Sequence, residues 1–98
     1  MRYLTVDGMM SGTGIRDSVE GGYLEPRELG VSCELAEEIS SWLKGYEDAH
    51  YDQYQDQAMV AALDDEGLRI CRQLRKELVG VKVEYYSSAR MQRMPTEP

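Results

Sequence analysis

The sequence has no Phe, a single His and only two Cys among its 98 residues. Nucleophilic catalysis by a Cys–His pair would require His50 to lie beside Cys33 or Cys71. Both Cys fall near the apolar stripes of expected helices, where isolated thiols are typical of small core residues. His50 is then either an exposed contact residue or a structural His. We find no catalytic motif, no cofactor motif and no metal-ligand pattern, and expect a protein that is not an enzyme.

Long apolar runs and basic residues are also scarce. No stretch approaches the roughly 18 apolar residues of a membrane span, and no apolar segment typical of a signal peptide follows Arg2. We therefore expect a cytoplasmic, reducing location and no membrane contact. The 11 basic residues stand against 18 acidic ones, a net charge of −7. Because nucleic-acid binding depends on Lys and Arg, this balance argues against direct contact with nucleic acid and favours a basic protein partner.

The acidic residues concentrate in one part of the chain. Residues 34–66 hold ten acidic residues and one basic residue, a net charge of −9, whereas residues 67–98 have a net charge of +4. The acidic segment also contains the only Trp, the only His and three of the seven Tyr. We therefore expect a basic partner to bind there.

The strand signals in the sequence are short. Residues 2–6 (RYLTV) favour extended backbone and end at an Asp-Gly turn signal, and residues 81–86 alternate apolar and polar side chains. In the long Gly-rich loop after the first strand, a pair of Gly favours a small hairpin between residues 15–19 and 23–24. Since a two-stranded sheet is only marginally stable, we expect this hairpin to widen the sheet.

Two amphipathic helices are predicted between these strands. Ser32 is a suitable N-cap for the first helix, which should run to about Glu47, and Asp56 can cap the second. Gly80 suits the end of the second helix, and Gly67, unfavourable inside a helix, marks either close packing or a break. Apolar residues at helical spacing define the faces that we expect to be buried. They are Leu35, Ile39, Trp42, Leu43 and Tyr46 in the first helix and Met59, Leu63, Ile70, Leu74 and Leu78 in the second.

These elements predict the α+β class. We expect one domain over residues 1–98, a small two-layer sandwich in the order β-(loop/hairpin)-α-α-β, with both helices on one face of the sheet. Residues 87–98 are expected to form a loose C-terminal tail. We expect a monomer or a weak dimer.

Two segments resemble known sites only superficially. The GMMSGTG segment at residues 8–14 follows a strand, but it lacks the Gly-Lys-Ser/Thr ending of a phosphate loop and no helix follows it. We interpret it as a structural or partner-contacting turn. Asp64-Asp65-Glu66 does not match a calcium-binding loop. Three consecutive acids on a helix point in three directions, so a solvated face is the simpler interpretation.

The strongest candidate site is the acidic segment around the end of the first helix, in which Tyr residues are interleaved. Tyr offers a large contact area with few rotatable bonds, and the acids around it attract and pair with Lys and Arg of a partner. The alternative is a solvated helix end whose Tyr rings pack on the core. We predict partner binding by Tyr46, Glu47, Asp48, His50, Tyr51, Asp52, Tyr54 and Asp56, with Glu37, Glu38, Asp64 and Asp65 as secondary contacts.

Four segments carry a resemblance to a known family: MRYLTVD, SGTGIRDSVEGGYLEPRELGVS, the W-x3-YEDAHY pattern at Trp42–Tyr51, and KVEYYS. Together they resemble the small bacterial immunity proteins of contact-dependent growth inhibition and related polymorphic toxin systems. The resemblance implies that the protein stays in the cytoplasm of the producing cell. There it would bind the C-terminal toxin domain of a cell-surface effector and block it. The resemblance supplies no catalytic residues.

Many toxins of these systems are nucleases, often acting on transfer RNA, and their substrate clefts are basic. The resemblance therefore implies an immunity protein that neutralises a cognate toxin domain, a basic tRNA- or DNA-cleaving nuclease, through the acidic Tyr-containing surface. Binding in the toxin's cleft and binding away from it both remain open. A different interpretation is an acidic regulatory or assembly module that binds another basic protein, or a nucleic-acid mimic.

Overall fold

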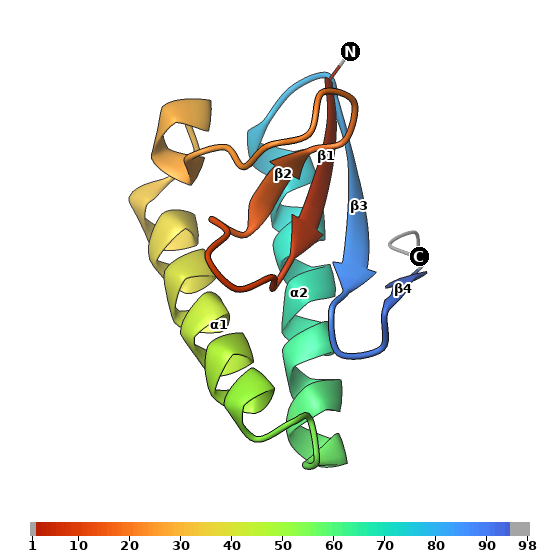
Figure 1. Ribbon diagram of the computed structural model, residues 1–98. Coiled ribbons are helices and arrows are strands. Elements are labelled where there is room, and N and C mark those ends of the chain that lie inside the picture. The colour runs from red at the N-terminus through yellow and green to blue at the C-terminus, as the bar shows by residue number, and fades with distance from the viewer. Residues whose placement is uncertain (1, 95–98) are drawn as a thin grey trace.

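In the computed structural model, which describes residues 2–94, two helices pack on a four-stranded mixed sheet (Figure 1). This architecture confirms the predicted α+β class and its two layers. The elements, in chain order, are β1 (Arg2–Asp7), β2 (Ile15–Asp17), the 3-10 helix η1 (Pro26–Leu29), α1 (Cys33–Tyr51), α2 (Gln57–Glu77), β3 (Val81–Ser87) and β4 (Gln92–Met94).

The sheet has the strand order β2-β1-β3-β4. The two predicted strands, β1 and β3, are the central pair, and they run parallel, with Leu4 opposite Val83 and Val6 opposite Tyr85. A parallel pair requires a long crossover connection. The α1–α2 hairpin is the longest part of the chain between β1 and β3. Both helices belong to this crossover connection, so both pack against the sheet.

The predicted hairpin in the long loop is present but narrow. β2 pairs antiparallel with β1, and Arg16 forms a single bridge to Tyr23 on the returning segment. Gly21 and Gly22 both adopt φ of 78°, the left-handed region that Gly enters without steric cost. Val19 is exposed at the turn. The hairpin therefore widens the sheet through its first strand.

The C-terminal segment differs from the loose tail expected over residues 87–98. β3 runs to Ser87, the chain reverses through a turn with Met91 at φ of 55°, and β4 pairs antiparallel with the end of β3. Backbone pairing with β3 therefore orders residues 92–94. Residues 95–98 of the predicted tail lie outside the described part of the chain.

The core lies between the sheet and the helices. Leu4, Val6 and Val83 point toward the helices and are buried, whereas Lys82 and Glu84 on the opposite face of β3 are exposed. This alternation is typical of a sheet covered on one face. The helices bury Leu35, Ile39, Trp42 and Tyr46 from α1 and Val60, Leu63, Ile70 and Leu74 from α2.

Two predicted core residues are on the surface instead. Met59 is 41% exposed because it lies in the first turn of α2, where Val60 is the residue that turns inward. Cys33 is exposed because it is the first residue of α1, before the buried stripe begins at Leu35. Cys71 is buried, as predicted.

Gly67 marks close packing and not a break, because α2 continues through it without interruption. A Cβ atom at this position would lie 2.2 Å from Cε1 of Tyr85. Because Gly67 has no side chain, the Tyr85 ring can pack directly against α2 at this position. The same ring lies 6.1 Å from the ring of Trp42, so α1, α2 and β3 meet at this point.

Ser32 caps α1, as predicted, and also ties α1 to the end of α2. Its hydroxyl accepts the N–H of Leu35 at 3.1 Å. Its own N–H and hydroxyl donate to the two carboxylate oxygens of Glu77, at 2.7 and 2.9 Å. The hydrogen bond from the Ser32 N–H is the main reason why the pKa of Glu77 lies below its ordinary value of 4.5.

This depressed pKa predicts a pH-dependent contribution to stability. Glu77→Gln is expected to be less stable than the wild type at pH 7, because the ionised carboxylate accepts these bonds more strongly. The contribution is complete above the unfolded pKa of about 4.5 and is lost as the pH falls through the lower folded pKa. Urea unfolding at pH 7 and pH 3 measures it, with Glu28→Gln on η1 as the control. A stability gap that does not narrow in acid would contradict the prediction.

Candidate functional site

The predicted contact segment forms the tip of the helical hairpin, at the end of the molecule away from η1 (Figure 1). α1 ends at Tyr51, and the chain reverses through Gln53 and Tyr54, whose φ values are 58° and 56°. Such values are uncommon for residues other than Gly. Asp56 caps α2 by accepting the N–H of Met59 at 3.0 Å, as the sequence predicted. We call residues 47–56 the helical tip.

Aromatic rings anchor the helical tip to the core. The ring of Tyr54 packs edge-on against Tyr46, with centroids 6.2 Å apart. The His50 ring lies 5.7 Å from that of Tyr54, and its Nδ1 is 3.3 Å from the Tyr54 hydroxyl. Tyr51 lies on the outer side of His50, at 6.0 Å, and is 71% exposed. The tip therefore presents Tyr51 to solvent above a supported cluster of rings.

The acids of the helical tip carry uncompensated charge. Glu47, Asp48, Asp52 and Asp56 are all exposed. Within residues 2–94, no side chain forms an ion pair with any of the four. The sequence has no Lys or Arg between Lys44 and Arg69. Because Lys44 is the one base near these four acids in the sequence, this end of the molecule has a negative potential that attracts cations.

Two predicted contacts, Tyr46 and Asp64, are wrong because both side chains are buried. Tyr46 is 0% exposed and Asp64 is 1% exposed. The Asp64 carboxylate accepts hydrogen bonds from the hydroxyls of Tyr46, Tyr85 and Ser87 at 2.7, 2.6 and 2.9 Å. It also accepts one from Nε of Arg90 at 3.0 Å. Four donors fill the acceptor capacity of a carboxylate, so the Asp64 charge is fully hydrogen-bonded, by three buried hydroxyls and by Arg90, which is partly exposed.

The tyrosines of this network act as hydrogen-bond donors. Burial raises the pKa of Tyr46, and burial together with the bond to Asp64 raises the pKa of Tyr85. Both phenols therefore keep their protons at neutral pH. The network joins α1, α2, β3 and the turn after β3, and its geometry suits structural support of the helical tip.

The other secondary contacts are not part of the helical tip. Glu37 is exposed, while Glu38 is half-buried and pairs with Arg69 of α2. Both lie near the start of α1, about 20 Å from Tyr51 at the rise of an α-helix. Asp65 is exposed on α2. The structure thus gathers the primary residues at one end and leaves the secondary acids along the helices.

The structure does not assemble a Cys–His pair. Burial raises the pKa of the Cys71 thiol to about 12, which makes it a poor nucleophile at neutral pH. Cys33 and His50 lie at opposite ends of α1, about 25 Å apart at the helical rise. Among the described residues, no group of three or more His, Cys, Asp or Glu is placed to hold a metal ion.

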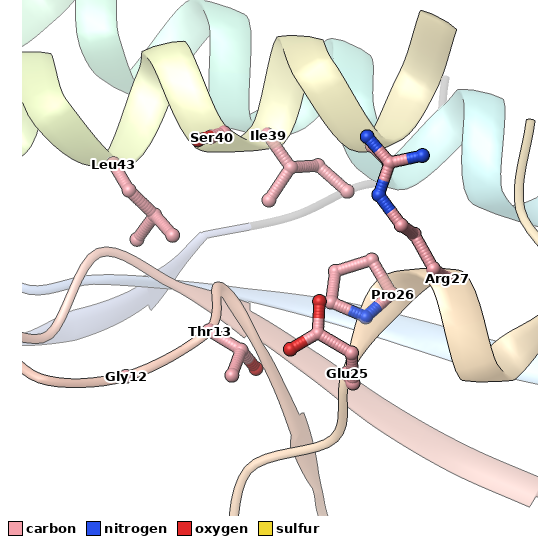
Figure 2. Close-up of a pocket in the computed structure, with 9 residues that line it drawn as sticks. Gly12, Thr13, Glu25, Pro26, Arg27, Ile39, Ser40 and Leu43 are labelled. Carbon is pink, nitrogen blue, oxygen red and sulfur yellow. The ribbon is translucent and has the colours of Figure 1, made fainter. Parts of the chain in front are cut away.

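Sequence reasoning missed a trough between α1 and the N-terminal loops. Two adjoining pockets, of about 320 and 370 Å³, share Gly12 and Leu43. Figure 2 shows the first, which is lined in part by Thr13, Glu25, Pro26, Ile39, Ser40 and Leu43. The second is lined in part by Met9, Met10, Ser11, Leu43, Lys44 and Glu47. The available signal was the Met9-Met10 pair, two apolar residues in a loop otherwise rich in Gly, Ser and Thr.

A hydrogen-bond network fixes the loop wall of the trough. Asp7, buried at the end of β1, accepts from Nε of Arg16 at 3.1 Å, from the Tyr23 hydroxyl at 2.9 Å and from the Met9 N–H at 3.3 Å. Burial and the bond to Asp7 raise the pKa of Tyr23 to about 12, so its hydroxyl stays a donor. The loop is therefore held in place at its first residues.

Comparison with known proteins identifies the family. A family model described as Serratia CdiI immunity protein-like matches residues 4–88, from β1 to the turn after β3. The chain belongs to this family. Membership confirms the resemblance to immunity proteins of contact-dependent growth inhibition that the sequence suggested. Neither the curated proteins nor the solved structures gave a significant match. In the described part of this CdiI-like protein, neither helix is apolar enough to cross a membrane.

The buried network of this CdiI-like protein predicts a large difference between two neighbouring acids. Asp64→Ala is expected to destabilise the fold by about 3–5 kcal/mol, because it leaves the buried hydroxyls of Tyr46, Tyr85 and Ser87 without their acceptor. Asp65→Ala, at an exposed position one residue further along, should change stability by about 0.5 kcal/mol or less. Urea unfolding followed by the fluorescence of the buried Trp42 measures both. Similar stability of the two variants would rule out a supporting role for the network.

Proposed function

We propose that the protein is the cytoplasmic immunity partner of a cognate toxin and neutralises it by binding through the helical tip. The observation that carries this proposal is the combination of an exposed Tyr51 with four exposed carboxylates that have no ion pair within residues 2–94. Membership of the CdiI immunity protein family supports a toxin as the partner.

The chemistry of the helical tip suits a basic protein partner. Tyr51 provides a large side chain whose polar end can bind at the interface and whose ring can be buried there. Glu47, Asp48 and Asp52 attract Lys and Arg from a distance and pair with them on contact. Tyr54, held between His50 and the buried Tyr46, limits the motion of the turn. A preformed surface loses less entropy on binding.

A nuclease is the toxin class that this surface fits best. Enzymes that bind nucleic acid present Lys and Arg to the phosphates. A rigid surface of carboxylates competes for the same basic side chains, so binding of the tip in the cleft excludes the substrate. The proposed contacts are Glu47, Asp48, His50, Tyr51, Asp52, Tyr54 and Asp56, with Glu37, Glu38 and Asp65 outside the centre.

Charge reversal at the helical tip tests the location of the interface. Glu47→Lys, Asp48→Lys and Asp52→Lys in one chain should slow association with the toxin domain encoded immediately upstream by about 100-fold or more at low salt. The salt dependence of association should become much weaker. Stopped-flow or surface-binding kinetics at several salt concentrations measures both quantities.

A matched control separates the local surface from the net charge. Glu20→Lys, Glu28→Lys and Glu34→Lys change the net charge by the same amount, at exposed positions away from the helical tip. This variant should associate much faster than the tip variant. Equal slowing of the two would show that net charge, and not the tip, steers binding. No complex between the wild type and the toxin domain would contradict the proposed function itself.

Tyr51→Ala tests whether the tip is buried in the complex. Because Tyr51 is largely exposed in the free protein, its loss should leave the stability of the fold unchanged. Removal of a central aromatic anchor should raise the Kd for the toxin domain by about 30-fold or more, mainly through faster dissociation. Isothermal titration calorimetry measures the Kd, and thermal unfolding provides the control. Unchanged affinity would place Tyr51 outside the interface.

A further inference from the structure

The trough offers a second contact region that is continuous with the helical tip. Glu47 belongs to both, since it lines the second pocket and begins the tip. Leu43, one turn earlier on α1, lies in the shared floor of the two pockets. A partner bound at the tip therefore meets the trough as it extends along α1 toward η1.

The floor and walls of the trough favour a long side chain with an apolar stem. Leu43 provides the accessible apolar surface on α1, above the buried Ile39, and Pro26 closes the pocket from the loop side (Figure 2). In the second pocket, Met9 is 53% exposed although it belongs to a loop whose backbone is bonded to Asp7. Methionine side chains adapt to the shape of what they contact, and an exposed Met beside an apolar floor is suited to a partner's side chain.

One carboxylate and one base line each pocket of the trough, Glu25 with Arg27 in the first and Glu47 with Lys44 in the second. Figure 2 shows the Glu25 carboxylate directed into the first pocket, while the Arg27 guanidinium lies beside the start of α1. There Arg27 contacts the sulfur of Cys33 at 3.5 Å. Within residues 2–94, neither Glu25 nor Glu47 forms an ion pair. Because Arg27 is directed toward Cys33, Glu25 is the charged group that faces the first pocket, next to the apolar surface of Leu43, and it can accept a basic head group.

We infer that the trough receives an Arg or Lys side chain from a loop of the toxin, which extends the interface from the helical tip along α1. The aliphatic stem covers Leu43, and the charged head pairs with Glu25. This inference rests on the proposed function, because it names a second part of the same interface and the chemistry of the group that occupies it. The loop of residues 8–14 thereby becomes a wall of the binding surface.

Adjacent serines on α1 provide the test. Ser40 and Ser41 are both exposed, but only Ser40 lines the trough. Ser40→Tyr places a phenol ring over the first pocket and should raise the Kd for the upstream-encoded toxin domain by at least about tenfold. Ser41→Tyr adds the same group outside the trough and should leave the Kd within about twofold. Thermal unfolding of both variants checks that each is folded.

A second pair of variants tests the basic head group without adding bulk. Glu25→Gln should weaken binding by at least about fivefold and should reduce its dependence on salt. Glu28→Gln, an exposed acid of η1 that lines neither pocket, should have no effect. If Ser40→Tyr binds weakly but Glu25→Gln binds normally, the side chain that occupies the trough is not basic.

The failure of this inference is distinguishable from the failure of the proposed function. If the wild type binds the toxin domain and the helical-tip variants lose binding, the proposed function stands. If Ser40→Tyr and Ser41→Tyr then bind the toxin domain with equal affinity, the trough is not part of the interface, and only this inference fails. If the wild type binds no toxin domain, the proposed function fails, and the trough inference fails with it.

Discussion

The buried Asp64 carboxylate is the interaction on which most of the structure depends. It accepts hydrogen bonds from Tyr46 of α1, from Tyr85 and Ser87 of β3 and from Arg90 in the turn beyond. A buried charge is tolerated only when donors surround it, so the carboxylate requires all of these elements at once. The fold leaves room for the rings, because a Cβ at Gly67 would collide with Tyr85 and one at Gly8 would collide with Tyr46. The network therefore determines how the two helices and the sheet meet, and it supports the surface above it through the contact between Tyr46 and Tyr54.

Helix α1 has one side in the core and another that faces the N-terminal loops. Trp42 and Tyr46 face the core, and the Trp42 indole N–H donates to the carbonyl of Leu63 at 2.8 Å, which fixes α1 against α2. Leu43 and Glu47 lie on the side that faces the N-terminal loops, and the trough and the helical tip meet there. Asp56 stabilises α2 as its N-cap, but the other acids of the tip add little to stability, because exposed carboxylates without partners contribute almost nothing to folding. The fold therefore does not require Glu47, Asp48 or Asp52.

Much of the fold follows from local patterns in the sequence, whereas the burial of individual polar side chains does not. The caps at Ser32 and Asp56, the apolar spacing of both helices and the alternation in β3 are local signals, and each predicted its element. Asp64 was assigned to the surface because of its charge, although it shares the buried face of α2 with Val60, Gly67 and Cys71 at helical spacing. Tyr46 likewise combined a core position with a residue type common at interfaces.

The trough depends on how a loop packs against a helix, and β4 depends on pairing with β3, so neither has a strong local pattern. The exposed part of the helical tip was predictable because it lies between two capped helices.

The parallel pairing of β1 with β3 has a consequence for the order in which the chain can fold during synthesis. The first strand of the sheet finds its central neighbour only when residues 81–87 have left the ribosome, and until then the α1–α2 hairpin has no complete sheet to cover. Contacts between residues so distant in sequence are slow to form, because a long loop must close first. The hydrogen bonds from Tyr85, Ser87 and Arg90 to Asp64 also cannot form until these residues are synthesised. The Asp64 carboxylate therefore acquires most of its donors last. An incomplete chain therefore lacks the network that supports the helical tip, and the tip reaches its final form only in the finished molecule.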